Sequence, residues 1–199
     1  MANAGFNIHQ DSSNQDQDLW NALMNGNENA YARIYEYNIE DLYSYGKNIC
    51  TRTNLVEDAI QDVFTDLWKY KSNVSPVRSI KAYLFISLRR KLMKILQREK
   101  LRILHNDEIT GDNFQWVNSI QELLIAEQEL KTRVRRVEKA MQELSKRQKE
   151  IIYLRYFQDL SHQEIAEMMG LNQRNTYNLI SKAVNLLKDK LIVVLFILI

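Results

Sequence analysis

Apolar residues recur every three or four positions along most of the 199-residue chain, and few segments alternate with a period of two. This spacing predicts amphipathic helices rather than strands. Glycine and proline are scarce, at five and one, so long helical segments have few breaks. We therefore expect an all-α protein. The predicted helices span residues 16–24, 28–52, 55–70, 79–102, 122–143, 146–156, 161–169 and 173–190.

The last two helices form the most specific pattern in the chain. Ser161 followed by Glu164 is a capping box, and Gly170 stands where a chain leaves a helix with positive φ. Asn172 then caps a second helix whose inner positions are apolar except Thr176, where an aliphatic residue would seal the helix crossing better. The pattern predicts a DNA-binding helix-turn-helix; the alternative is an ordinary helical hairpin with a solvated polar face. The side chains of the second helix that can reach DNA are Gln173, Arg174, Asn175, Tyr177, Asn178, Ser181 and Lys182.

The helix over residues 55–70 combines an apolar stripe with an acidic and polar face. Such a face is either simply solvated or a docking surface for a basic partner, and the helix alone favours solvation. The acidic and polar residues are Glu57, Asp58, Gln61, Asp62 and Asp66.

The helix over residues 79–102 is apolar on one side and has seven cations in its second half, against the single acid Glu99. Cations bind phosphate and aromatic side chains stack on bases, so the helix suits single-stranded or opened DNA. The alternative is a solvated face that interacts with the helix dipole. The cations are Arg89, Arg90, Lys91, Lys94, Arg98, Lys100 and Arg102.

Charge and composition limit the function classes. The net charge is only +2, so nucleic-acid binding is argued from local clusters of charge. The single cysteine, Cys50, excludes an internal disulfide and fits a small buried residue. No histidine pair has metal-ligand spacing, and no phosphate loop or nucleophile motif occurs. We therefore expect no enzyme activity, no cofactor, no metal and no small-molecule substrate.

The remaining segments define the expected domain organisation. Residues 1–15 are polar and predicted to be disordered, without the basic start and apolar core of a signal peptide. Residues 103–120 are predicted to be a flexible linker between helical domains at 16–102 and 121–190. The apolar tail, 191–199, is too short for a membrane span, which needs about 20 residues.

Three segments of the chain resemble the sigma-70 family of RNA polymerase sigma factors, and in particular its small extracytoplasmic-function group. The three segments follow one another in the same order as in that family. The family's polymerase-docking region is similar to LVEDAIQDVFTDLWKYK. Its −10 reading and melting region is similar to IKAYLFISLRRKLMKILQREK. Its region 4 is similar to LSKRQKEIIYLRYFQDLSHQEIAEMMGLNQRNTYNLISKAVNLLK. The resemblance implies a cytoplasmic factor that binds core RNA polymerase and directs transcription initiation at promoter DNA.

The resemblance also implies roles for particular residues. The −35 contacts would come from the second helix of the helix-turn-helix, while region 4 sits on the polymerase β flap. The clamp coiled coil of the β′ subunit would be contacted by Asp58, Gln61, Asp62 and Thr65. The non-template strand of the −10 element would be held by Tyr83, Phe85, Arg89, Arg90, Lys94 and Arg98.

Two positions depart from the family pattern. The pair Arg89-Arg90 stands where many members have Arg-Asn, and Thr176-Tyr177 stands where many have Val-Lys. The string Tyr177-Asn178-Leu179 and the apolar C-terminus resemble members from Bacteroidetes-type bacteria. The tail would either pack back on region 4 or dock a regulator, commonly an anti-sigma factor in this family. Two other functions fit the same residues: a stand-alone helix-turn-helix regulator and a helical protein–protein adaptor.

Overall fold

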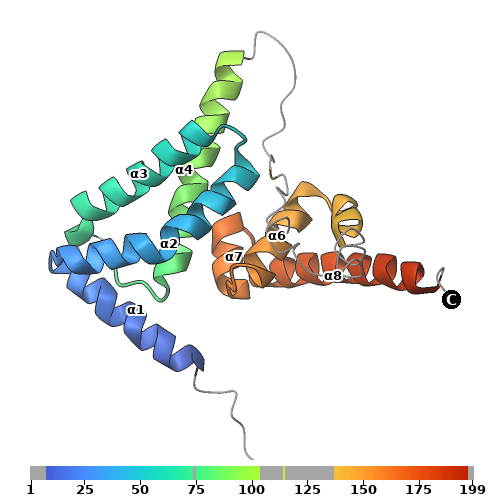
Figure 1. The fold of residues 1–199 in the computed structure, drawn as a ribbon, viewed down its shortest axis with the longest axis horizontal. Coiled ribbons are helices and arrows are strands. Elements are labelled where there is room, and N and C mark those ends of the chain that lie inside the picture. The colour runs from blue at the N-terminus through green and yellow to red at the C-terminus, as the bar shows by residue number, and fades with distance from the viewer. Residues whose placement is uncertain (1–7, 74, 104–113, 115–136, 197–199) are drawn as a thin grey trace, which may run out of the picture. The chain divides into compact units, whose positions relative to one another are not determined.

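The computed structural model describes residues 8–73, 75–103, 114 and 137–196, and not the side chains of 8–14, 100–103 and 190–196 (Figure 1). The regular structure of these residues is helical and contains no strand, as the hydrophobic pattern predicts. The chain divides into two compact units, residues 1–106 and 107–199, at a point inside the predicted linker.

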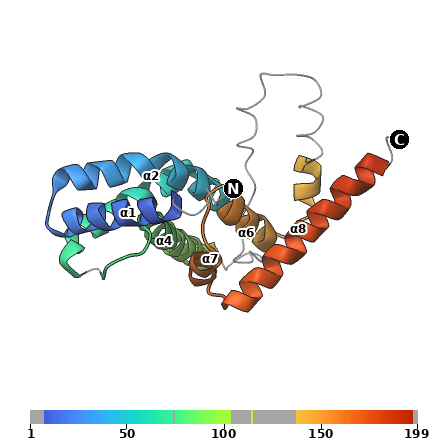
Figure 2. The same ribbon diagram turned by 90° about the horizontal axis from the view of Figure 1, so that it is seen from below.

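The first unit is built from four helices and one short 3-10 turn. They are α1 (Ile8–Met24), α2 (Glu28–Ile49), α3 (Thr53–Lys69), η1 (Lys71–Asn73) and α4 (Ile80–Ile103). Helices α2, α3 and α4 each pack against the other two, and α1 packs against α2 and η1 (Figures 1 and 2). The largest fully buried side chains in this core include Trp20, Tyr45, Phe85, Leu42, Leu67 and Leu88.

Local signals set the junction between α1 and α2. Gly26 has a φ of 82° in the turn between α1 and α2, and Asn27 caps α2 by accepting a 3.0 Å hydrogen bond from the Ala30 amide. Helix α3 begins at Thr53, two residues before its predicted start, and its N-cap residue, Arg52, makes no side-chain capping bond. The disorder predicted for residues 1–15 is wrong from Ile8 onward, where α1 begins. Once the later turns of a helix are packed in place, each further residue adds a backbone hydrogen bond, so the free-energy cost of extending the helix through polar sequence is small.

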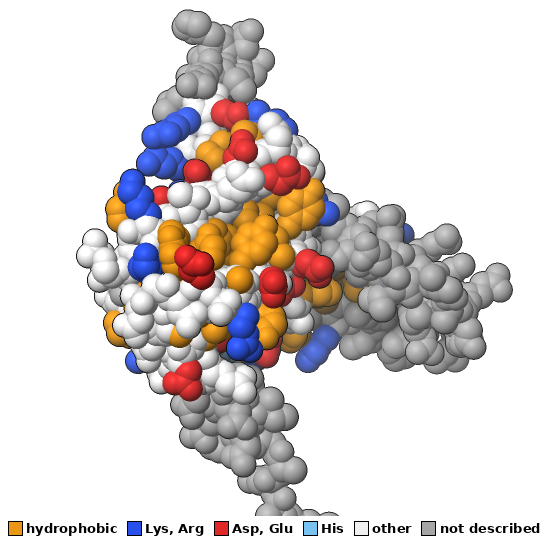
Figure 3. Space-filling view, turned by 60° about the vertical axis from the view of Figure 1, so that its left-hand side comes forward, with side chains coloured by type: hydrophobic (Ala, Val, Ile, Leu, Met, Phe, Trp, Pro, Cys, Tyr) orange, Lys and Arg blue, Asp and Glu red, His pale blue; other side chains and the backbone are white. Residues whose placement is uncertain are grey.

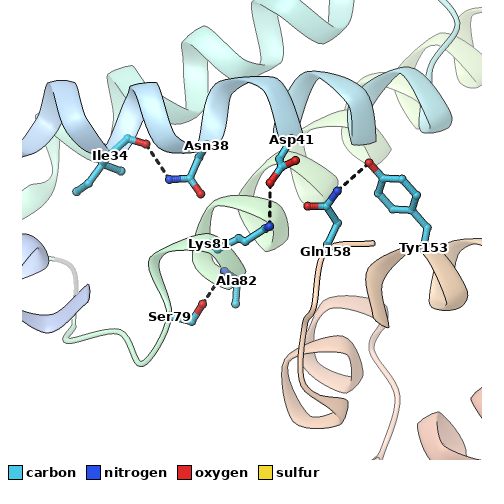
Figure 4. A network of polar contacts seen from close by, with 8 residues as sticks. All are labelled: Ile34, Asn38, Asp41, Ser79, Lys81, Ala82, Tyr153 and Gln158. Atoms are coloured by element: carbon cyan, nitrogen blue, oxygen red, sulfur yellow. Dashed lines mark hydrogen bonds and ion pairs between the residues drawn. The ribbon is translucent and has the colours of Figure 1, made fainter. Parts of the chain in front are cut away.

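The second unit contains helical residues 137–142, followed by α6 (Lys146–Tyr156), α7 (His162–Met169) and α8 (Gln173–Phe196). Helices α6, α7 and α8 pack against one another. The first part of the helix predicted over 122–143 lies outside the described residues. The buried Gln158 donates a 3.0 Å hydrogen bond from Nε2 to the Tyr153 hydroxyl, which fixes the chain after α6 (Figure 4).

The apolar tail continues α8 as far as Phe196, six residues beyond the predicted helix end. No glycine or proline interrupts this stretch, so nothing in the sequence ends the helix earlier. The backbone therefore makes no turn back onto the unit before Phe196. Among the described residues, no helix is long and apolar enough to cross a membrane.

Candidate nucleic-acid interface

The turn between α7 and α8 has the geometry that its sequence predicts. The Ser161 hydroxyl accepts from the Glu164 amide at 3.3 Å, and the Glu164 carboxylate accepts from the Ser161 amide at 2.7 Å. Gly170 has a φ of 62° and closes α7 by donating to the carbonyls of Ala166 and Glu167. The capping box and the left-handed glycine are both confirmed, so the sharp turn is encoded locally.

The start of α8 is fixed by its own cap and by a buried threonine. The Asn172 side chain accepts from the Asn175 amide at 2.7 Å, which confirms the predicted cap. Thr176 is fully buried, as expected of an inner position. Its hydroxyl donates to the Asn172 carbonyl at 3.1 Å, so the polar group that departs from the family pattern has a partner inside its own helix.

The outer face of α8 presents the predicted DNA-contacting residues to solvent. Positions 174, 178 and 182 follow one another at a spacing of four, so they form one stripe along the helix. Between Gln173 and Lys188 the helix carries basic and polar side chains and no acid. Ser181 is half-buried, and the exposed members of the set are Gln173, Arg174, Asn175, Tyr177, Asn178 and Lys182.

Helix α4 divides its cations between two surfaces. Arg90, Lys94 and Arg98 are exposed and follow one another every four residues, which makes a single basic stripe. Arg89 is half-buried beside it. Lys91 instead points to α3, where its Nζ lies 2.7 Å from Asp66 Oδ2 and 3.6 Å from Asp62 Oδ2.

The two aromatic residues predicted to meet the −10 strand have different surroundings. Tyr83 is half-buried, so part of the residue remains accessible at the surface. Phe85 is fully buried, and its ring centroid lies 5.1 Å from that of Tyr45. The assignment of Phe85 to DNA contact therefore needs correction, because its ring fills the core. The first turns of α4 are apolar on most of their circumference, so the sequence pattern does not separate these two rings.

The exposed face of α3 brings together the four residues expected to bind polymerase. Asp58, Gln61, Asp62 and Thr65 are all exposed and occupy positions i, i+3, i+4 and i+7, which lie on one side of a helix. Figure 3 shows Asp and Glu side chains around an apolar patch on one face of the first unit. Of the four, Asp62 is already near a cation, Lys91.

Aromatic side chains from α2 lie next to this face of α3. The sequence pattern did not predict that they would lie there. The Tyr31 ring centroid lies 5.1 Å from that of Trp68, and the Tyr35 centroid lies 4.8 Å from that of Phe64. Burial, and then the neighbouring Tyr35 phenol, raise the pKa of Tyr31. A cavity of about 430 Å³ between the helices is lined by Glu28, Tyr31, Thr65, Trp68 and Lys69.

The second unit matches a known sequence family. Residues 125–187 match the family described as Sigma-70, region 4, and this stretch contains the helix-turn-helix. The predicted resemblance to the sigma-70 family is confirmed. The region 4 match stops short of the apolar tail and does not include the first unit. No curated protein matches the sequence.

The fold is similar to that of two solved structures. One is the sigma factor RpoE from Bartonella quintana in complex with the anti-sigma factor NepR, with 19% identity, a TM-score of 0.58, and coverage of 81% of this chain and 96% of that chain. The other is CnrH in complex with the cytosolic domain of CnrY, with 21% identity, a TM-score of 0.55, and coverage of 88% of this chain and 96% of that chain. At these identities the likeness establishes a shared fold.

Proposed function

We propose that this protein is a sigma factor that binds core RNA polymerase and directs it to promoter DNA. The observation that carries the proposal is the exposed basic and polar stripe of α8, on a helix-turn-helix that matches sigma-70 region 4. The exposed cation stripe of α4 supports it independently. The chain itself would supply recognition and no catalysis, and it would act where polymerase acts, in the cytoplasm.

In this proposal α8 enters the −35 major groove by its N-terminal half. Arg174 can pair with the two acceptors of a guanine, and Asn175 or Asn178 can pair with an adenine edge. Lys182, two turns further along, would bind phosphate and set the position of the helix. Region 4 as a whole would rest on the β flap of the polymerase.

The α4 stripe would hold the opened non-template strand of the −10 element. Arg90, Lys94 and Arg98 offer three charges in line for successive phosphates, with Arg89 beside them. Tyr83 offers the partly exposed ring for stacking on a base. Phe85 is not included, because it is buried.

Docking to the β′ clamp would use the α3 face of Asp58, Gln61, Asp62 and Thr65. These four exposed groups at helical spacing suit a basic helix of the partner, and the charge of the two carboxylates would speed association. An anti-sigma factor is a second expected partner, because the solved RpoE structure holds one.

The test is binding of the labelled full-length chain to core polymerase. Replacing Asp58 and Asp62 together by Arg should weaken binding by at least tenfold, because two attractive charges become repulsive. The matched control is Asp18→Arg, a reversal of an exposed acid on α1, which should bind as the native chain does. Absence of any binding by the native chain would overturn the proposal.

The helix-turn-helix by itself also fits a stand-alone regulator. Tight binding to duplex DNA without polymerase, as a dimer with a palindromic footprint, would favour that function. Retained function after Arg174, Asn178 and Lys182 are replaced by Ala would instead favour a protein–protein adaptor.

A further inference from the structure

We propose that helix α1 positions the first turn of α4, and that Asp16 and Trp20 are positioning residues for −10 strand binding. The inference rests on the proposed function, because it concerns the helix assigned to that strand. Its basis is three contacts at Ile80, Lys81 and Tyr83, each made by a residue of another helix.

The first contact caps α4 from a distant part of the chain. The Asp16 carboxylate accepts a 3.0 Å hydrogen bond through Oδ2 from the amide of Ile80, the first residue of α4. The first amides of a helix have no partner inside the helix, so each needs an acceptor from elsewhere. The Ser79 hydroxyl accepts from the Ala82 amide at 3.1 Å (Figure 4). The start of α4 is thus shared between its own N-cap and a carboxylate 64 residues earlier.

The second contact fixes the aromatic residue of the proposed strand site. Trp20 follows Asp16 by one turn of α1, so both face the same way. Its side chain is 1% exposed, and its ring meets the Tyr83 ring edge-on, with centroids 5.2 Å apart and planes at 67°. The indole nitrogen has no hydrogen-bond partner among the described residues, so Trp20 contacts Tyr83 through ring packing alone. Trp20 is the surface against which the ring of the half-buried Tyr83 rests.

The third contact comes from α2 and holds a side chain of the same turn. Lys81 Nζ lies 2.8 Å from Asp41 Oδ2 (Figure 4). Lys81 lies nine residues before Arg90, on the opposite side of α4 from the exposed stripe, so this pair holds the first turn from its other side. With Asp16 on the backbone and Trp20 on Tyr83, three of the first four positions of α4, namely Ile80, Lys81 and Tyr83, are held by other helices.

These contacts bear on strand binding and not on polymerase docking. Helices α2 and α3 also hold α4, so the α1 contacts act on its first turn, which carries Tyr83. Tyr83 lies seven residues before Arg90 and therefore on the same side of α4 as the stripe at Arg90, Lys94 and Arg98. The docking face lies on α3, to which Asp16 and Trp20 show no hydrogen bond or ring contact among the described residues. Loosening the α1 contact should therefore change one activity and spare the other.

The test uses the complex of the full-length chain with core polymerase and a single-stranded −10 non-template oligonucleotide. Asp16→Ala should weaken oligonucleotide binding about three- to tenfold, the size of a lost helix cap, and leave binding to core polymerase unchanged. Asp16→Asn should retain most of the binding, since its amide oxygen can still accept from Ile80. Asp18→Ala is the matched control, an exposed acid on the same helix, and should bind as the native chain does.

A second measurement separates this inference from the proposed function. In the free protein, Asp16→Ala should speed amide hydrogen exchange at Ile80 and leave exchange in α3 unchanged. Slow exchange at Ile80 in Asp16→Ala, or equal loss of strand and polymerase binding, would overturn the positioning role. If exchange responds as expected but the native chain fails to bind polymerase, the proposed function fails and the α1 cap stands.

Discussion

Gly46 of α2 lies so close to Val56 of α3 that a Cβ added to the glycine would stand 2.4 Å from Val56 Cγ1. Both residues are buried, and the atom in the way belongs to a stiff β-branched side chain. A glycine in the middle of a helix usually weakens it, so its presence here is explained by the close approach of the two helices.

Gly46→Ala should destabilise the first unit by about 1–3 kcal/mol, the usual cost of overpacking, less the gain in helix propensity from alanine. Denaturant unfolding followed by tryptophan fluorescence measures this change. The double variant Gly46→Ala with Val56→Ala is the control, because it removes the clashing methyl groups. A single variant as stable as the native chain would show that α2 and α3 can separate freely.

Gly170→Ala should destabilise the second unit by about 1–2 kcal/mol, because alanine disfavours the left-handed conformation that Gly170 adopts. No atom lies within 4 Å of an added Cβ, so the cost is conformational and not steric. Gly170→Asn should cost less, since asparagine tolerates this conformation better. Amide exchange in α7 and α8 measures both. Equal losses for Ala and Asn would contradict this explanation.

Thr176→Val should leave the stability of the second unit unchanged or slightly higher. The residue is fully buried, and the carbonyl that accepts from its hydroxyl also accepts from its amide at 3.0 Å. Removing the hydroxyl therefore leaves no acceptor without a partner. Thermal unfolding measures the effect, with Thr176→Ala as the comparison that leaves a cavity. A large loss in the valine variant would assign the hydroxyl a role that this structure does not show.

The phenol of Tyr31 should titrate above its ordinary value near 10, because burial and the Tyr35 phenol both disfavour the phenolate. Since the folded pKa is raised, its contribution to stability is complete below the unfolded pKa and is lost as the pH rises through the folded one. An NMR titration of the Tyr31 ring measures this pKa. Tyr35→Phe should lower it partway, and a native value at or below 10 would contradict the assigned burial.

The helix-turn-helix could be predicted in detail because its signals are local. Ser161 and Glu164 are three residues apart, Gly170 needs no partner to adopt its conformation, and Asn172 caps its own helix. Each of these choices depends on a few neighbouring residues. The same holds for the stripe of exposed side chains on α3, whose spacing alone puts them on one face.

The contacts that set the first unit could not be predicted in the same way. Asp16 and Ile80 are 64 positions apart, and nothing in either neighbourhood indicates the other. Phe85 and Tyr83 are both aromatic residues in an apolar stretch, and only the packing of Tyr45 and Trp20 separates them. Lys91 lies among cations and is directed to Asp66 by the placement of α3.

The most direct test of the proposed function is transcription in vitro by core RNA polymerase with and without this protein, with start sites mapped across genomic DNA. The expected result is initiation at a defined set of sites only when the protein is present. Replacing Arg174 and Asn178 by Ala should reduce initiation at those sites, while the variant still binds core polymerase. No protein-dependent start sites, despite correctly folded protein and active core enzyme, would contradict the assignment as a sigma factor.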